Sequence, residues 1–167
     1  MKVLVTAASR HGSTFEMAEA IGRTIGARGY TVAVLPIENV TGLDGYDAVV
    51  LGSGVYMSFW LKPARDFVEA NAAVLRRKPV WLFSSGPLGP AKPGAEPVQI
   101  PEVIDAVQPR DHRVFDGRLD TSRLGFGEKA VVWAVKAPAG DFRDWQAVEA
   151  WAAGIADSLA QENGAAA

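Results

Sequence analysis

The segment Lys2–Ala7 (KVLVTA) runs directly into a small polar loop, Ala8–Ser13 (ASRHGS). The first part is a short apolar run with β-branched residues, which predicts a buried strand. Apolar residues then recur with helical spacing over residues 14–28, and Gly29 suits the end of that helix: Phe15, Ala18, Ile21 and Ile25. A strand that leads through a short polar loop into a helix is typical of the α/β class.

The same alternation continues along the chain. Strands are predicted at Tyr30–Leu35, Asp47–Gly52 and Pro79–Ser84, with a fifth around Arg113–Phe115; helices are predicted at Pro63–Leu75 and Asp144–Leu159. The run at 47–52 lacks a polar–apolar alternation, which indicates a strand covered on both faces. We therefore expect a doubly wound, five-stranded parallel sheet with helices on both faces. The proline-rich stretch 87–109 predicts a loop with at most one short helix around Glu102–Val107.

Length and composition narrow the class of protein. The 167 residues suit a single domain over residues 1–160, with a disordered tail at 161–167. A net charge of −2 gives no support for nucleic-acid binding. The absence of cysteine excludes disulfides, thiolate catalysis and cysteine-bound metal, and two histidines leave little for any metal site. No apolar run suits a signal peptide or membrane span, so we expect a cytoplasmic location.

The loop after the first strand has the features of a phosphate site. A helix N-terminus offers unpaired backbone N–H groups, and a glycine lets the backbone curl around an anion. The residues expected to hold a phosphate are Ser9, Arg10, His11, Gly12, Ser13 and Thr14. The simpler interpretation is that Ser13 or Thr14 only caps the helix.

Two further strands end in similar small polar loops. The loop after the third strand contributes Ser53, Gly54, Val55, Tyr56 and Met57, and the loop after the fourth contributes Ser84, Ser85, Gly86, Pro87 and Leu88. In open α/β sheets, ligands bind outside the carboxyl ends of the strands. The large side chains of these loops are suited to stacking on a flat ring, whereas Phe59 and Trp60 could instead anchor the next helix.

These motifs together resemble a known family. Ser9-x-x-Gly12-x-Thr14, Val50–Tyr56 and Trp60–Pro63 are similar to the flavodoxin-like proteins, closest to the menaquinone-dependent protoporphyrinogen oxidase group, and 135–145 is similar to the segment before that group's last helix. The resemblance implies a strand order of 2-1-3-4-5 and an FMN cofactor. It implies that the phosphate lies on residues 9–14 and the ring between the loops of residues 53–57 and 84–88.

The sequence also departs from the family pattern. His11 stands where the usual loop has a threonine, and Arg10 and His11 add positive character beside the expected phosphate. Pro87-Leu88-Gly89 offers no counterpart to the aromatic residue that commonly covers the outer face of the ring. The acidic surface of carrier flavodoxins is missing as well.

An extra apolar segment at 119–143 bears on function. Within Leu119–Lys136, the residues Phe126 and Ala130–Val135 form an apolar stretch, which is edged by basic residues: Arg118, Arg123, Lys129 and Lys136. It is either a packed helix or homodimer contact, or a wall for a hydrophobic substrate, with peripheral contact to the inner face of the membrane.

The resemblance implies an FMN-dependent oxidoreductase that passes electrons from a porphyrinogen to a quinone-type acceptor. The alternative is an electron carrier or regulatory flavin-binding module without a substrate of its own, whose partner is a redox protein. An NAD(P)H-dependent quinone reductase is less favoured, because no nucleotide-recognition loop is visible.

Overall fold

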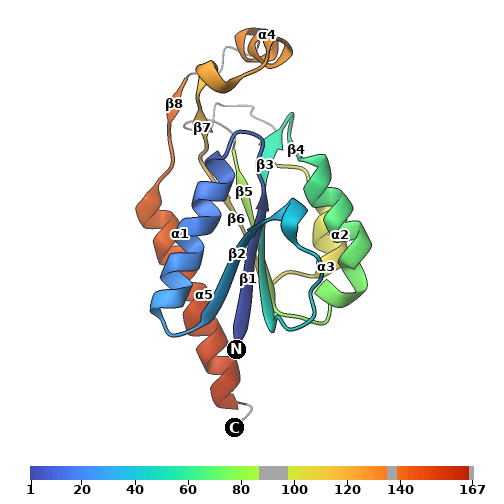
Figure 1. Cartoon of the computed structure of the whole chain (residues 1–167), viewed down its shortest axis with the longest axis vertical. Coiled ribbons are helices and arrows are strands. Elements are labelled where there is room, and N and C mark those ends of the chain that lie inside the picture. The colour runs from blue at the N-terminus through green and yellow to red at the C-terminus, as the bar shows by residue number, and fades with distance from the viewer. Residues whose placement is uncertain (87–97, 135–138, 166–167) are drawn as a thin grey trace.

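A central parallel sheet organises the chain (Figure 1). The computed structural model describes residues 1–86, 98–134 and 139–165. The parallel strands are β1 (Lys2–Ala8), β2 (Thr31–Pro36), β3 (Ala48–Tyr56), β5 (Val80–Ser85) and β6 (Asp111–Phe115). Their order is β2-β1-β3-β5-β6, and the short strand β4 (Phe59–Trp60) returns antiparallel to β3. This is the predicted order 2-1-3-4-5 once the β4 return is set aside, so the fold prediction is confirmed.

Helices cover both faces of the sheet (Figure 1). Helices α1 (Ser13–Ala27) and α5 (Trp145–Ala165) pack on one face, and α2 (Lys62–Leu75) and α3 (Pro101–Val107) pack on the other. Strand β1 serves both layers, since Val3 and Val5 join the first core and Leu4 joins the second. Burial on both faces explains why the strand sequences do not alternate between apolar and polar residues.

Two boundaries differ from the prediction because tertiary contacts extend the elements. Strand β3 continues past Gly52 to Tyr56, since its last residues still pair with β5 and β4. Helix α5 continues to Ala165, past residue 161, from which the sequence predicts a disordered tail. An ion pair between Glu162 and Arg110, just before β6, ties this last part of the helix to the sheet.

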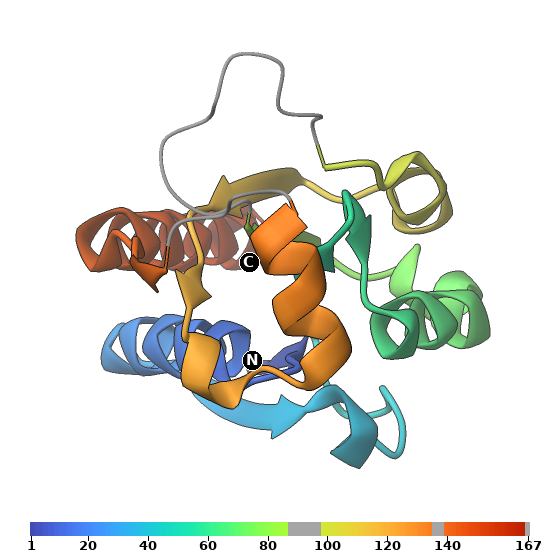
Figure 2. The ribbon, with the colours of Figure 1, turned by 90° about the horizontal axis from the view of Figure 1, so that it is seen from above.

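The extra segment forms a structure of its own beyond the strand ends. It comprises β7 (Arg118–Leu119), the 3-10 turn η2 (Thr121–Arg123), α4 (Phe126–Ala134) and β8 (Gly140–Asp141), and β7 pairs with β8. Viewed from above, α4 lies across the carboxyl end of the sheet (Figure 2). Among the described residues, no helix is both long enough and apolar enough to cross a membrane.

Candidate functional site

The predicted loops meet at one edge of the sheet. The parallel register places Ala8 beside Ser53, and Ser53 beside Ser84, so β1, β3 and β5 end in one row. The first two loops also approach closely, because a Cβ atom at Gly54 would lie 3.2 Å from Thr14 Oγ1. A side chain at position 54 would therefore press on the start of α1. The loops over residues 9–14, 53–57 and 84–86 therefore lie side by side at this edge of the sheet.

The loop over residues 9–14 presents an uncapped helix start. Gly12 is the N-cap residue, with φ of +86° in the left-handed region, and no side chain in the described part of the chain caps the first turn. Ser13 and Thr14 lie inside the helix, so the interpretation that one of them serves as the cap is wrong. The Ser13 Oγ atom is buried and has no hydrogen-bond partner among the described residues. Unused donors at a helix N-terminus are what an anion requires.

The side chains of Arg10 and His11 flank this loop, and a carboxylate faces them. The Arg10 guanidinium lies over the Tyr56 ring, 5.2 Å from its centroid. Glu128 Oε1, from α4, lies 2.8 Å from Arg10 Nε and 3.2 Å from His11 Nε2. The N–H of Gly125 is the main cause of the lowered pKa of Glu128, and His11 and Arg10 add to it. Sequence reasoning did not find Glu128.

Two of the predicted serines have their hydroxyl groups engaged inside the protein. Ser53 Oγ accepts a hydrogen bond from the Leu61 backbone N–H at 3.0 Å and donates to the Gly54 carbonyl. Ser84 Oγ accepts from Trp60 Nε1 at 2.7 Å and lies 2.8 Å from His112 Nε2. Both serines are fully buried. Their hydroxyl groups hold the neighbouring β3–β4 hairpin to the sheet, and the Trp60 side chain of that hairpin is buried, at 1% exposed.

The β3–β4 hairpin carries the large exposed side chains of the site. Tyr56, Met57 and Phe59 are 39%, 67% and 49% exposed. Met57 and Ser58 form its turn, with φ of +50° and +69°, which matches a type I′ turn built without glycine. The hairpin lies close to the end of β5, because a Cβ atom at Gly86 would lie 3.4 Å from Val55 Cβ.

The end of β5 supplies the third part of the site. Ser85 is 8% exposed, and Gly86 has φ of +126° and donates its backbone N–H to the Phe115 carbonyl at 2.8 Å. Pro87 and Leu88, also predicted as site residues, lie outside the described residues.

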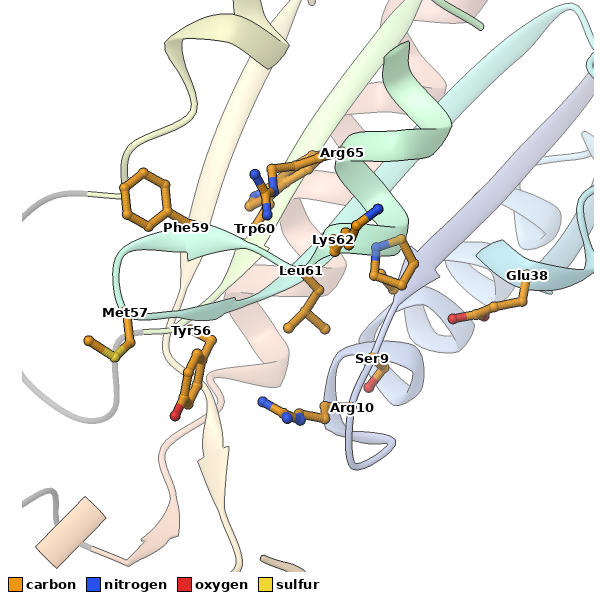
Figure 3. A pocket seen from close by; sticks show the side chains of 12 residues that line it. Ser9, Arg10, Glu38, Tyr56, Met57, Phe59, Trp60, Leu61, Lys62 and Arg65 are labelled. Carbon is orange, nitrogen blue, oxygen red and sulfur yellow. The ribbon is translucent and has the colours of Figure 1, made fainter. Parts of the chain in front are cut away.

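A groove of about 710 Å³ opens between the first loop, the hairpin and the start of α2 (Figure 3). Ser9 lines it together with aromatic and charged side chains, among them Arg10, Glu38, Tyr56, Phe59 and Arg65. Arg10 points across it toward Tyr56. Of the β5 loop, the described residues 84–86 do not line this groove. The ring position between the loops of residues 53–57 and 84–88 therefore stays a prediction.

A buried arginine holds the start of α1 in place. The Arg143 side chain is 4% exposed and binds the Asp141 carboxylate through two nitrogens, at 2.8 and 2.7 Å. Its Nη1 atom also contacts Glu16 Oε2 at 2.5 Å and donates to the Ser13 carbonyl at 3.3 Å. These partners raise the pKa of Arg143, the hydrogen bond to Asp141 most of all. The residue therefore stays charged and ties β8 to the first turn of α1.

Comparison with known proteins agrees with the fold described above. A family model described as a flavodoxin domain matches residues 4–146. The chain belongs to the flavodoxin family. A flavodoxin from the domain Archaea is 21% identical with a TM-score of 0.66, and the match covers 95% of this chain and 99% of that one.

Two more solved structures share the fold. A mutant of flavodoxin from Pseudomonas aeruginosa is 16% identical with a TM-score of 0.64, and the match covers 95% and 99% of the two chains. Rubredoxin:oxygen oxidoreductase from Desulfovibrio gigas is 15% identical with a TM-score of 0.64, over 96% of this chain and 36% of that one. This flavodoxin-family chain therefore spans about the full length of two solved flavodoxins and about a third of a larger oxidoreductase.

Flavodoxin-family proteins bind FMN, the cofactor implied by the sequence resemblance. The residues present fit its phosphate. Gly12 supplies the left-handed turn, and Ser13 supplies a buried hydroxyl group without a partner. The start of α1 supplies backbone N–H groups and positive partial charge.

Proposed function

We propose that this chain is an FMN-binding electron-transfer domain. The observation that carries the proposal is the uncapped start of α1, with Gly12 in the left-handed region and the Ser13 hydroxyl group unpartnered among the described residues. In this proposal the loop of residues 9–14 holds the phosphate, while Tyr56 and Met57 cover one side of the ring. When bound, FMN supplies the redox chemistry, and the protein binds it and controls access to it.

A protein partner is favoured over a small hydrophobic substrate. A wall for a porphyrinogen would turn the apolar side chains of α4 toward the flavin site. Phe126 and Trp133 are instead 96% and 83% exposed. They share one face of α4, opposite the face on which Glu128 contacts Arg10 and His11. The apolar face therefore points away from the loop of residues 9–14, where a partner protein could reach it.

Full-length similarity to solved flavodoxins also supports the carrier function. The oxidase function implied by the sequence resemblance would require turnover without any protein partner. The −2 net charge differs from the strongly acidic balance of a carrier steered by charge, so we expect recognition of the partner to depend on apolar contact as well.

The test begins with reconstitution. The purified chain is titrated with FMN and with riboflavin, and bound flavin is followed by absorbance and fluorescence. The reduced holoprotein is then mixed with oxidised redox proteins, and in parallel the oxidised holoprotein is mixed with a porphyrinogen plus a quinone. We expect FMN binding and electron exchange with a protein. Failure to bind FMN would refute the proposal, and sustained porphyrinogen oxidation without a partner would assign the oxidase function instead.

A further inference from the structure

The Glu128 carboxylate contacts both Arg10 and His11, in the loop that we assign to phosphate. We propose that Glu128 is an internal competitor of the FMN phosphate, so that it sets the preference between FMN and riboflavin and leaves Arg10 and His11 when FMN binds. This inference rests on the proposed FMN-binding function. It adds a residue on α4, 117 positions from His11, to the determinants of flavin selectivity.

The two carboxylate oxygens of Glu128 have separate partners. Oε1 lies 2.8 Å from Arg10 Nε and 3.2 Å from His11 Nε2. Oε2 accepts the backbone N–H of Gly125 at 2.8 Å and so caps the start of α4. A carboxylate and a phosphate monoester make the same charge-assisted hydrogen bonds to arginine and histidine. A phosphate at the start of α1 would draw on the side chains that Oε1 now contacts.

The helix that carries Glu128 is lightly attached. Among the described side chains of α4, none is fully buried. Polar contacts tie its segment to the loop of residues 9–14: the Glu128 carboxylate, and Arg123 Nη1, which donates to the His11 carbonyl at 3.1 Å. Because little apolar surface holds α4 down, loss of the Glu128 contacts should loosen the helix without unfolding the sheet.

The opposite role is distinguishable by experiment. If Glu128 positioned Arg10 and His11 for the phosphate, removing its charge would weaken FMN binding. If it competes, removing its charge strengthens FMN binding. Riboflavin lacks the phosphate, so competition leaves riboflavin affinity nearly unchanged.

The central variant is Glu128→Gln, because glutamine at this helix position preserves the cap to Gly125 while removing the charge. The matched control is Glu69→Gln, which makes the same change in net charge at an exposed position on α2. Both flavins are titrated into each protein. We expect the Kd for FMN to fall roughly threefold or more in Glu128→Gln only, as for loss of a half-exposed ion pair. The Kd for riboflavin should stay within about twofold.

Two further measurements locate the effect. In an Arg10→Ala background, Glu128→Gln should lose most of its effect on FMN affinity, because one competing cation is gone. Hydrogen exchange of residues 126–134 in the wild type should accelerate on adding FMN and stay unchanged on adding riboflavin.

Each outcome decides the question. Unchanged or weaker FMN binding in Glu128→Gln, or slower exchange of α4 with FMN, overturns the competition while FMN binding itself stands. A wild-type protein that binds neither flavin overturns the proposed function, and the inference with it.

Discussion

Gly12 offers a direct test of the phosphate site. Its φ of +86° lies in the region that other residues rarely adopt, and alanine there costs about 1–2 kcal/mol. Space is not the obstacle, since the nearest heavy atom to a new Cβ would be Arg123 Nη1 at 3.9 Å. The Gly12→Ala variant must therefore either keep the strained turn or rotate it. Rotation turns the first N–H groups of α1 away from the phosphate.

Gly29 provides a matched control at the other end of the same helix. Its φ is +93°, and a new Cβ there would meet nothing within 4 Å. Both alanine variants should lose about 1–2 kcal/mol of folding free energy if the turns keep their conformation. Each kcal/mol corresponds to a fall in Tm of roughly 2–4 °C for a chain of this size.

Flavin affinity separates the two variants. In Gly12→Ala we expect the Kd for FMN to rise about tenfold, equivalent to about 1.4 kcal/mol, while the Kd for riboflavin changes much less. Gly29→Ala should leave both constants unchanged. Fluorescence titration below the melting range measures all four values. Wild-type FMN affinity in Gly12→Ala would refute the assignment of this loop to the phosphate.

Three more changes test other parts of the structure. Replacing Ser58, which has φ of +69° in the hairpin turn, by glycine should stabilise the fold by about 1 kcal/mol and raise Tm by roughly 2–4 °C; an unchanged or lower Tm in thermal unfolding would contradict the strained-turn interpretation. Burial lowers the pKa of His112 from 6.5, and Asp111 only partly opposes the shift, so the unfolded chain binds this proton more readily. The contribution of neutral His112 to the free energy of unfolding is therefore fully present above pH about 6.5. Below that pH it is lost, by at most about 1.4 kcal/mol per pH unit. Denaturant titrations at several pH values should show that this part of the pH dependence of stability vanishes in His112→Gln. Trp133→Ala should change the free energy of unfolding by no more than about 0.5 kcal/mol, because the side chain is 83% exposed; a loss of several kcal/mol in chemical denaturation would place this indole in a packed contact.

Local sequence was enough to predict the main sheet and the three loops. Strands β1, β3 and β5 are predicted by apolar runs that end in small polar residues, and both features can be read from the local sequence. Their ends were harder to predict, because pairing decides where a strand stops. The residues after Gly52 resemble a loop, yet they remain strand because Gly54 pairs beside Ser85 and Tyr56 beside Phe59.

The roles of individual side chains depended more on distant partners. Ser53 and Ser84 lie in loops whose small polar residues predict ligand binding. Their hydroxyl groups instead hold the β3–β4 hairpin to the sheet. Arg143 reaches Ser13 across 130 positions, with no local motif to mark it. The apolar composition of α4 likewise predicted that it would pack or line a wall. It could not show which face of the helix would turn outward.

The orientation of α4 places Glu128 against the start of α1. Glu128 lies on the face of the helix opposite Phe126 and Trp133, and it binds Arg10 and His11 at the start of α1. Glu128 is partly buried there together with Val131 and Val132, whereas Phe126 and Trp133 stay exposed. A helix that contacts the loop of residues 9–14 through a carboxylate can respond to the charge of a ligand bound there. The same residue would then link FMN loading to the position of the aromatic surface that a redox partner meets.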